Sequence, residues 1–434
     1  MPYQTGALPG YMRSIAVLCS DQAINSIIRS VCERFPEDFT PVFLSDKESF
    51  VQYLNYEFPE IDIVYHSDPA IDIGGAIETI KDDPWLHFGG SIVVYDRGNE
   101  QTLHGRLTGA NIISLIHRSR LELYLYRVLA VLSQNRSILF QRDIHAMLQS
   151  NLSGLFVIDN DPFDVTTYSN LLANFMYNSN LINLDQKENF YSAIVELLIN
   201  AIEHGNCRIT FEEKREFLER TPDILDLIRR KNLDPEVGRK KVYLTYRITP
   251  SVSHFTIRDE GIGFDWRTFA LRDDPSSDDF HGRGIMVARH YLGDLMYNEA
   301  GNAVSFEIQH ADHESNVVPG VFVDQEEVTF QDGETVFEQG ASSSHLYYII
   351  SGKFDIIANG KTISTLTPAD IFLGEMSFLL NNRRSATVIS RGRGVCIRIS
   401  KKAFINAIKK HPHYGIFLAR LLAQRLDQLH DITI

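Results

Sequence analysis

The sequence predicts a multidomain α/β protein that ends in a β-roll. In the first 119 residues, short apolar runs alternate with helical patterns, as in a parallel sheet with connecting helices. Residues 151–312 combine strand-like runs with long amphipathic helices, which is typical of an α/β sandwich. Residues 321–434 have short apolar runs broken by glycines, followed by two helical patterns. A length of 434 residues is enough for two to four domains.

The composition excludes several functional classes. A hydrophobic content of 44% is ample for packed cores, and a net charge of −14 argues against broad nucleic-acid binding, which needs a basic face. The four cysteines are scattered without metal-ligand spacing, so we expect reduced thiols and a cytoplasmic location. There is no signal peptide and no apolar run near 18 residues, so we expect no membrane association.

The N-terminal domain, residues 1–119, is expected to hold a parallel sheet. Its strand-like runs are residues 14–19, 40–44, 62–65 and 91–95. The series resembles the receiver domains of two-component systems. These need acids after the first strand, an acceptor Asp after the third and a Lys after the fifth. Here only Asp21 follows the first run, Ser67 stands at the acceptor position with Asp68 beside it, and residues 109–117 contain no lysine. The resemblance implies a degenerate receiver that docks partners or dimerises, with phosphorylation as the alternative.

Residues 120–150 are predicted to form a helical linker to the next domain. An apolar stripe repeats along this segment: Leu121, Leu125, Val128, Leu132 and Leu139. The stripe fits a dimer coil and a helix packed on a core equally well.

The segment 188–204 has the pattern of an amphipathic helix with a polar face. Apolar residues at helical spacing point to a core on one side. The opposite face is shared by residues at positions i, i+4 and i+7 or i+8, which are Glu196, Asn200 and Glu203 or His204. An amide oxygen on such a face can ligate Mg²⁺, and a carboxylate one turn earlier can deprotonate an attacking hydroxyl.

Two glycine motifs follow downstream. A strand-like run at 254–258 leads into Asp259-Glu-Gly261-Ile-Gly263, where glycines allow a close approach of the backbone to a ligand. Gly282-Arg-Gly284 then opens a helical pattern, and the free N–H groups at a helix start favour phosphate. The polar stretch 265–280 between the motifs fits a mobile lid.

Taken in this order, the three motifs resemble the ATP-binding fold shared by gyrases, Hsp90-type chaperones, histidine kinases and MutL proteins. The nearest branch is that of the bacterial anti-sigma serine kinases. The resemblance covers residues 151–312. It implies that Asn200 holds the metal, that Glu196 is the catalytic base and that Asp259 accepts a hydrogen bond from the adenine amino group. The nucleotide-binding glycines it implies are Gly261, Gly263, Gly282 and Gly284. Residues 207–241 depart from the family and are expected to form an inserted helical pair on the surface, which is solvated or docks a partner.

The segment 372–388 carries a second candidate site. Gly374 and Glu375 are followed by Arg384, ten residues after the glycine, and by Ser385. This spacing resembles the phosphate-binding cassette of cyclic-nucleotide-binding domains. The resemblance implies that Arg384 pairs with the cyclic phosphate and that Glu375 accepts the ribose 2′-hydroxyl, and the backbone N–H groups of Gly374–Met376 can cap the phosphate. A hydroxyl at Ser385 serves either base, so cAMP and cGMP both remain open, with a lean toward cAMP.

Two helical patterns follow the cassette, at 402–410 and 414–429. The second carries an apolar stripe of Leu418, Leu421, Leu422, Leu426 and Leu429. In the family this helix caps the ligand and often dimerises, so we expect a homodimer. No helix-turn-helix pattern follows, and we therefore do not expect a transcription factor of the catabolite-activator type.

We interpret the chain as a cyclic-nucleotide-responsive bacterial signalling protein. Its central domain is expected to bind Mg-ATP and to phosphorylate a Ser or Thr of an anti-anti-sigma-type partner. The alternatives are a non-catalytic scaffold that binds both nucleotides, an anti-sigma factor that sequesters a sigma factor, and an atypical histidine kinase. The last alternative needs a phospho-acceptor. His145 is the candidate, but it lacks the following acid and the later proline of such motifs.

Overall fold

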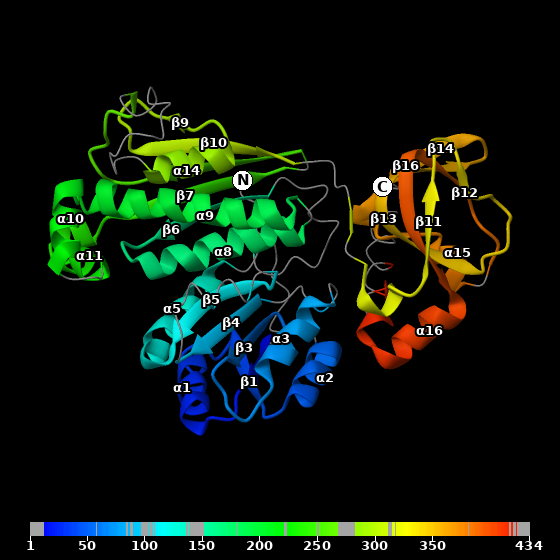
Figure 1. Cartoon of the computed structure of the whole chain (residues 1–434), viewed down its shortest axis with the longest axis horizontal. Helices are drawn as coiled ribbons and strands as arrows, with labels where there is room; N and C mark the ends of the chain where they lie inside the picture. Colours follow the sequence, from blue (N-terminus) through cyan, green and yellow to red (C-terminus); the bar gives the residue numbers. More distant parts are fainter. Residues whose placement is uncertain are drawn as a thin grey trace. The chain divides into compact units, whose positions relative to one another are not determined.

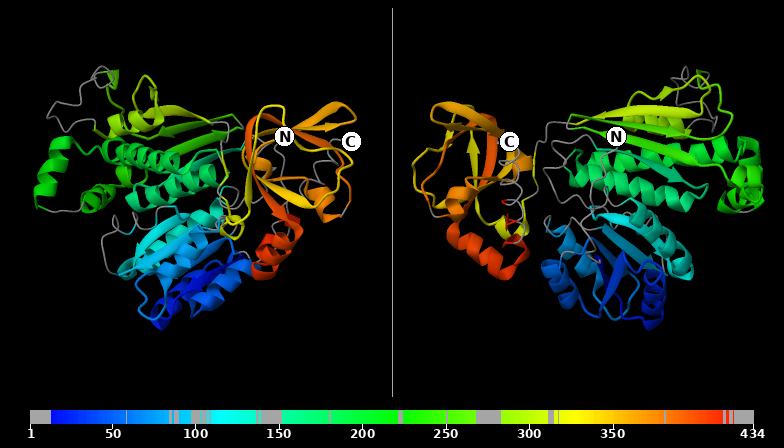
Figure 2. Two further views of the ribbon diagram at one scale, coloured as in Figure 1. Left: turned by 45° about the vertical axis from the view of Figure 1, so that its right-hand side comes forward. Right: turned by 180° about the vertical axis from the view of Figure 1, so that it is seen from behind.

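The computed structural model describes residues 13–422 except 58, 84–85, 87–89, 97–102, 104–106, 108, 136–137, 139–151, 180, 221–223, 250, 268–282, 311–314, 317, 381, 416–417 and 420–421. The chain forms two compact units. One unit comprises Met1–Phe140 and Glu314–Ile434, and the other comprises Gln141–His313. Figure 1 labels the elements, and Figure 2 shows them from two further directions.

The N-terminal domain contains a parallel sheet, as its apolar runs predict. The strands are β1 (Arg13–Leu18), β2 (Phe39–Leu44), β3 (Ile61–Tyr65), β4 (Gly90–Tyr95) and β5 (Ile112–His117). They pair in the order β2-β1-β3-β4-β5, and every pair is parallel, which is a doubly wound order. The connecting helices are α1 (Gln22–Cys32), α2 (Lys47–Glu57) and α3 (Ile73–Lys81). Helices on both sides of such a sheet bury it, which explains its nearly continuous apolar strands.

Two acidic residues of this domain, Asp68 and Asp21, are engaged in structural contacts. Asp68 is buried and accepts hydrogen bonds from the backbone N–H and the hydroxyl of Ser20, at 2.6 and 2.8 Å. Asp21 caps the start of α1 and forms an ion pair with Arg118 at 2.7 Å. Asp68 is therefore held in place by its neighbours rather than presented to solvent.

The helix after β5 packs on the same domain. Helix α5 (Leu121–Gln134) contacts α1 and β5. The predicted stripe residues Leu121, Leu125, Val128 and Leu132 are all buried. The predicted alternatives were a dimer coil and a helix packed on a core. Helix α5 is the second, because its stripe residues are buried within this domain. Leu139 and His145 lie outside the described residues.

The second unit is an antiparallel sheet covered by helices. Its strands are β6 (Leu152–Ile158), β7 (Val242–Ile248), β8 (Val252–Arg258), β9 (Met296–Tyr297) and β10 (Ala303–Gln309), in the order β6-β7-β8-β10-β9. Helices α8 (Pro162–Asn178), α9 (Leu184–Asn200) and α14 (Arg283–Leu292) lie along one face of it (Figure 1). Aromatic residues fill the layer between helices and sheet, with the rings of Phe190 and Phe255 5.1 Å apart. The α/β layering agrees with the predicted fold class of residues 151–312.

The inserted segment forms helices, as its composition predicts. They are α10 (Phe211–Arg220), α11 (Ile224–Asn232) and the short α12 (Pro235–Gly238). Helix α11 anchors the insertion through the buried side chains of Leu227 and Ile228, whereas α10 has no buried residue.

The C-terminal part is a roll of antiparallel strands. Its strands are β11 (Glu326–Phe330), β12 (Thr335–Phe337), β13 (His345–Ala358), β14 (Lys361–Leu366), β15 (Phe372–Leu373) and β16 (Thr387–Ser400). The two 14-residue strands β13 and β16 pair along their length with two shifts of register, and those bulges let the strands curve. Helix α15 (Glu375–Leu379) joins β15 to the segment before β16, and α16 (Lys401–Lys410) follows β16.

The end of the chain is described only in part. Leu418 is buried, whereas Leu421, Leu426 and Leu429 of the predicted stripe lie outside the described residues. The four cysteines are unpaired and buried. None of the helices in the described part of the chain has both the length and the apolar character needed to cross a bilayer.

Candidate functional site

Helix α9 carries the first candidate residues. It begins with a capping box, in which Asn183 and Gln186 satisfy one another's backbone N–H groups. Ile194, Leu197 and Leu198 are buried against the rest of the domain. This packing fixes the rotation of the helix, and Glu196 and Asn200 are thereby held on the opposite face.

The helix does not continue to residue 204 as an α-helix. A π-helical turn over Ala201–Asn206 follows it, and this turn widens the backbone where the polar residues lie. Glu203 is only 2% exposed, and its carboxylate pairs with the Lys214 ammonium at 2.6 Å. His204 Nδ1 lies 2.7 Å from the carbonyl oxygen of Ile209. Glu203 is thus a buried residue paired with Lys214, whereas Glu196 and Asn200 remain on the polar face of α9.

Asp259 lies directly after β8 and is 8% exposed. Its Oδ1 accepts a hydrogen bond from the N–H of Gly261 at 2.7 Å. A Cβ at Gly205 would lie 2.4 Å from the Asp259 carboxyl carbon, so only glycine permits this approach of the α9 end to β8. Burial raises the pKa of Asp259 above its usual value, against the lowering effect of the Gly261 hydrogen bond. A buried carboxylate is suited to accept a hydrogen bond from a ligand amino group.

The start of α14 meets the polar face of α9. A Cβ at Gly284 would lie 2.5 Å from Glu196 Oε2 and 3.2 Å from Asn200 Nδ2. The absence of a side chain at Gly284 therefore lets the first turn of α14 approach both residues. Gly263 has a φ of +79°, which favours glycine, and a Cβ there would collide with the Ala300 carbonyl. Gly282 lies outside the described residues.

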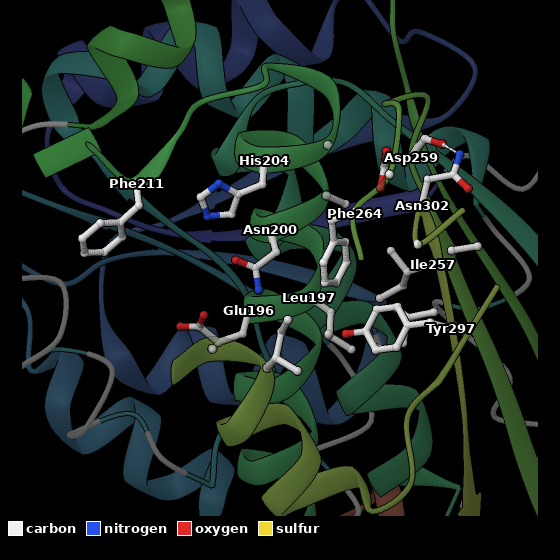
Figure 3. A pocket seen from close by; sticks show the side chains of 18 of the residues that line it. Glu196, Leu197, Asn200, His204, Phe211, Ile257, Asp259, Phe264, Tyr297 and Asn302 are labelled. Atoms are coloured by element: carbon white, nitrogen blue, oxygen red, sulfur yellow. Dashed lines mark hydrogen bonds between the residues drawn. The ribbon is translucent and has the colours of Figure 1, made fainter. Parts of the chain in front are cut away.

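These residues surround one cavity of about 430 Å³ (Figure 3). Five predicted site residues line it: Glu196, Asn200, Asp259, Gly263 and Gly284. Figure 3 shows Glu196 and Asn200 on one side of the cavity and Asp259 with Asn302 on the other. Gly261 is not a lining residue, but its N–H fixes the Asp259 carboxylate. The volume lies in the range of pockets that hold small-molecule ligands.

Burial and two neighbouring charges shift the pKa of Glu196 in the cavity. Burial raises the pKa of Glu196 above its usual value; the Lys214 ammonium lowers it, and the Glu203 carboxylate raises it further. A carboxylate with a raised pKa is a stronger base when it is deprotonated, so Glu196 has the character that proton abstraction needs. Asn200 lies one helical turn after Glu196, so its amide oxygen, a hard metal ligand, lies beside the base.

The cavity also has residues that sequence reasoning missed. Phe211 and Lys214 come from α10, so the insertion contributes to the cavity wall as well as to the surface. Phe264 and Tyr297 form an edge-to-face ring pair with centroids 5.5 Å apart, on the side of Asp259. Nothing in the charge-rich pattern of 207–241 distinguishes Lys214 from its neighbours, because its position depends on how α10 folds back.

The C-terminal cassette is built around Arg384, which is 4% exposed. Its Nη1 donates to the carbonyl oxygen of Gly374 at 2.9 Å and to Ser377 Oγ at 3.1 Å, and its Nη2 donates to the carbonyl oxygen of His345. The guanidinium also lies 4.1 Å from the centre of the Phe337 ring. Gly374 has a φ of +76°, and a Cβ there would lie 2.1 Å from Arg384 Nη1, so glycine is required on both counts.

Glu375 and Ser385 flank this arginine differently. Glu375 is buried, and its negative charge raises the pKa of Arg384, whereas burial lowers it and has the larger effect. Ser385 is exposed, directly after the buried arginine. Arg383 is an exposed neighbour that donates to the Gly340 carbonyl oxygen at 2.8 Å. The cassette thus presents a buried cation and a buried acid close together, which is the arrangement expected for a ligand with a phosphate and a hydroxyl.

Comparison with known proteins identifies this part of the chain. Residues 327–411 match the family model of the cyclic nucleotide-binding domain. The chain is 35% identical over 81 residues to the cGMP-dependent protein kinase of Plasmodium berghei (strain Anka), which is 19% of this chain and 9% of that protein. It is 34% identical over 102 residues to the Pycsar effector protein XpPycTIR of Xanthomonas perforans, which is 23% of this chain and 33% of that protein. The solved catabolite activator protein of Thermus thermophilus matches with 26% identity and a TM-score of 0.24, over 25% of this chain and 54% of that chain.

The chain therefore covers one third or less of the length of these two curated relatives. The family match shows that the β-roll is a cyclic nucleotide-binding domain, which confirms that prediction.

Proposed function

We propose that this protein couples a cyclic nucleotide to an ATP-dependent phosphoryl transfer. The cyclic nucleotide, cAMP or cGMP, binds the cassette around Arg384. Mg-ATP binds the cavity of the second unit, and its terminal phosphoryl group passes to a Ser or Thr of an anti-anti-sigma-type partner. The observation that carries the proposal is that Glu196 and Asn200 line one cavity with Asp259, which comes from a separate segment of the sequence.

In the cassette, Arg384 is the residue that pairs with the cyclic phosphate. Its guanidinium is buried and donates hydrogen bonds to uncharged acceptors, so a phosphate provides a charged acceptor for it. Glu375 accepts the ribose hydroxyl. The exposed Ser385 contacts the base, where its hydroxyl can donate or accept.

In the cavity, the donor set fits both ATP and Mg²⁺. Asp259 is buried at the end lined by Phe264 and Tyr297, where a purine ring finds aromatic neighbours and a hydrogen-bond acceptor. Asn200 offers an amide oxygen for Mg²⁺, which neutralises phosphate charge when it is bound. Lys214 adds a positive charge to the same wall.

Glu196 is the residue that acts on the proton. It takes the proton from the attacking hydroxyl of the partner, for which the raised pKa of this carboxyl is an advantage. Gly284 keeps the start of α14 close to Glu196, so that backbone N–H groups of a helix start face the transferred group.

The proposal is tested first by calorimetric titration of the full chain with Mg-ATP. We expect binding in the wild type and a loss of at least about tenfold in affinity in Asn200→Ala and in Asp259→Asn, since each removes a hydrogen bond or ligand to the nucleotide. Asp226→Asn is the matched control, because this exposed acid of α11 pairs with Arg229 away from the cavity. Wild-type affinity in both site variants would refute the site.

The second test separates catalysis from binding alone. Protein with γ-labelled ATP is mixed with a panel of anti-anti-sigma-type proteins, and labelled products are treated with acid. Phosphoserine and phosphothreonine survive acid, whereas phosphohistidine does not, so an acid-stable label supports the proposal and an acid-labile label supports a histidine kinase. ATP binding without any labelled product would instead support the non-catalytic scaffold or a sigma-sequestering anti-sigma factor.

A further inference from the structure

A cluster of metal-ligating side chains lies outside both nucleotide sites. Asp83, His411 and His413 each offer one ligand atom, and these atoms all lie within 4.8 Å of one another. Asp83 follows α3 by two residues, and the two histidines follow α16. Both segments belong to the same compact unit.

The centre of the cluster is removed from solvent. His413 is 0% exposed, and its Nε2 lies 2.7 Å from Asp83 Oδ2. Tyr414, which is also buried, donates its hydroxyl hydrogen to the same oxygen at 3.2 Å. His413 Nδ1 is buried and has no hydrogen-bond partner among the described residues. A buried polar atom without a partner is costly, and a buried imidazole with an unused nitrogen keeps its capacity to bind a further group.

The chemistry of the donors selects the ion. Two imidazole nitrogens and one carboxylate oxygen are ligands that Zn²⁺ binds readily, whereas Mg²⁺ and Ca²⁺ prefer oxygen ligands alone. The hydroxyl of Tyr414 orients the carboxylate, as hydrogen-bond partners of metal ligands commonly do.

We propose that Asp83, His411 and His413 form a Zn²⁺ site. Zinc commonly takes four ligands at bond lengths of about 2.0–2.2 Å, so three protein ligands leave one position for water.

Zinc at this position ties the end of the cyclic nucleotide-binding domain to the loop after α3. Tyr414 packs its ring against Phe322, with centroids 5.6 Å apart, and Phe322 stacks on Phe404 of α16. Fixing His411 and His413 therefore also fixes the segment that leaves α16. The metal thus has a structural role that is separate from both nucleotide sites.

The test uses the full chain after treatment with a chelator. Zinc is added in competition with a chromophoric zinc chelator, and bound metal is counted by elemental analysis. We expect one Zn²⁺ per chain in the wild type and a loss of about a hundredfold or more in affinity in His411→Ala, because removing even an indirect partner costs 10- to 100-fold. His411 is only partly buried, so this variant is the one least damaging to the fold.

Two controls keep the result interpretable. His254→Ala removes a partly exposed histidine that pairs with Glu307 in the other unit, and it should bind zinc like the wild type. Asp83→Asn keeps the shape of the side chain and should weaken zinc binding without unfolding the protein, which circular dichroism would check. Absence of stoichiometric zinc in the wild type, or equal zinc affinity in the wild type and in folded His411→Ala and Asp83→Asn, would overturn the proposal and leave a hydrogen-bonded contact.

Discussion

Arg384→Ala gives the most direct test of the cyclic-nucleotide site. In the wild type the guanidinium is held by the carbonyl oxygens of Gly374 and His345 and by Ser377 before any ligand binds. Little ordering is then needed on binding, so nearly the full interaction with the phosphate counts toward affinity. Charge-assisted hydrogen bonds contribute roughly 1.5–3 kcal/mol, and their loss should weaken cyclic-nucleotide binding about ten- to a hundredfold.

The assay is calorimetric titration of the full chain with cAMP and, separately, with cGMP. Thermal unfolding gives an independent reading, since a ligand at 100 times its Kd stabilises the folded state by about 2.7 kcal/mol. At the same ligand concentration, a hundredfold weaker variant should gain only about 0.4 kcal/mol. The same experiment ranks the two nucleotides, which the exposed hydroxyl of Ser385 does not decide.

Arg383→Ala is the matched control, because Arg383 is the exposed neighbour and contacts only the Gly340 carbonyl among the hydrogen bonds described for it. It should keep the wild-type affinity. Arg384→Lys should recover only part of the binding, because an ammonium keeps the charge but not the forked geometry. Equal losses in the Arg383 and Arg384 variants, or no loss in either, would refute the assignment of the phosphate contact to Arg384.

The structure supports four further predictions, for the cavity, for the N-terminal sheet and for coupling between the two nucleotide sites. Glu196→Gln should keep Mg-ATP binding and lose transfer of labelled phosphate, because a base acts in the reaction step; transfer at the wild-type rate would exclude Glu196 as the base. Lys214→Met should weaken Mg-ATP binding several-fold, whereas Lys231→Met, which removes the Glu213 pair of the same insertion, should not; equal titrations would exclude Lys214 from the site. Asp62→Asn should stabilise the protein above pH 7 and have little effect near pH 4, measured by urea unfolding. Burial raises the pKa of Asp62 from 3.8 to about 7. The free energy of unfolding is therefore highest below pH 3.8, and it falls by about 4 kcal/mol as the pH rises through 7. If the two nucleotide sites are coupled, cyclic nucleotide must change ATP affinity by the same factor as ATP changes cyclic-nucleotide affinity, and titration of each ligand with the other saturating measures both.

Much of the fold follows from local patterns in the sequence. The apolar runs 14–19, 40–44, 62–65 and 91–95 correspond to strands β1 to β4, because buried parallel strands are almost continuously apolar. The cassette is predictable because its two conformational requirements arise within one short segment. Gly374 has a positive φ, and the Arg384 guanidinium lies against Gly374 only ten residues later in the sequence.

The rest of the site depends on long-range packing. The pattern of residues 188–204 predicts one continuous α-helix, yet a π-helical turn begins at Ala201, because the close approach of Gly205 to Asp259 sets the backbone there. Lys214 reaches the cavity only because α10 folds back on the end of α9, where Glu203 pairs with it. No periodicity in the sequence reports such a contact, since the two partners belong to different helices.

The burial of all four cysteines has a practical consequence for labelling chemistry. Burial raises the pKa of Cys19 and Cys32 to about 12 and that of Cys207 to about 11, and it raises the pKa of Cys396 as well. Maleimides attack thiolates, and these thiols are both protonated and covered at neutral pH. A cysteine introduced at Leu233, which is 82% exposed, should therefore be the one thiol that a fluorophore modifies in the native protein. The response of the insertion to added nucleotide can then be tested by fluorescence without first replacing the native cysteines.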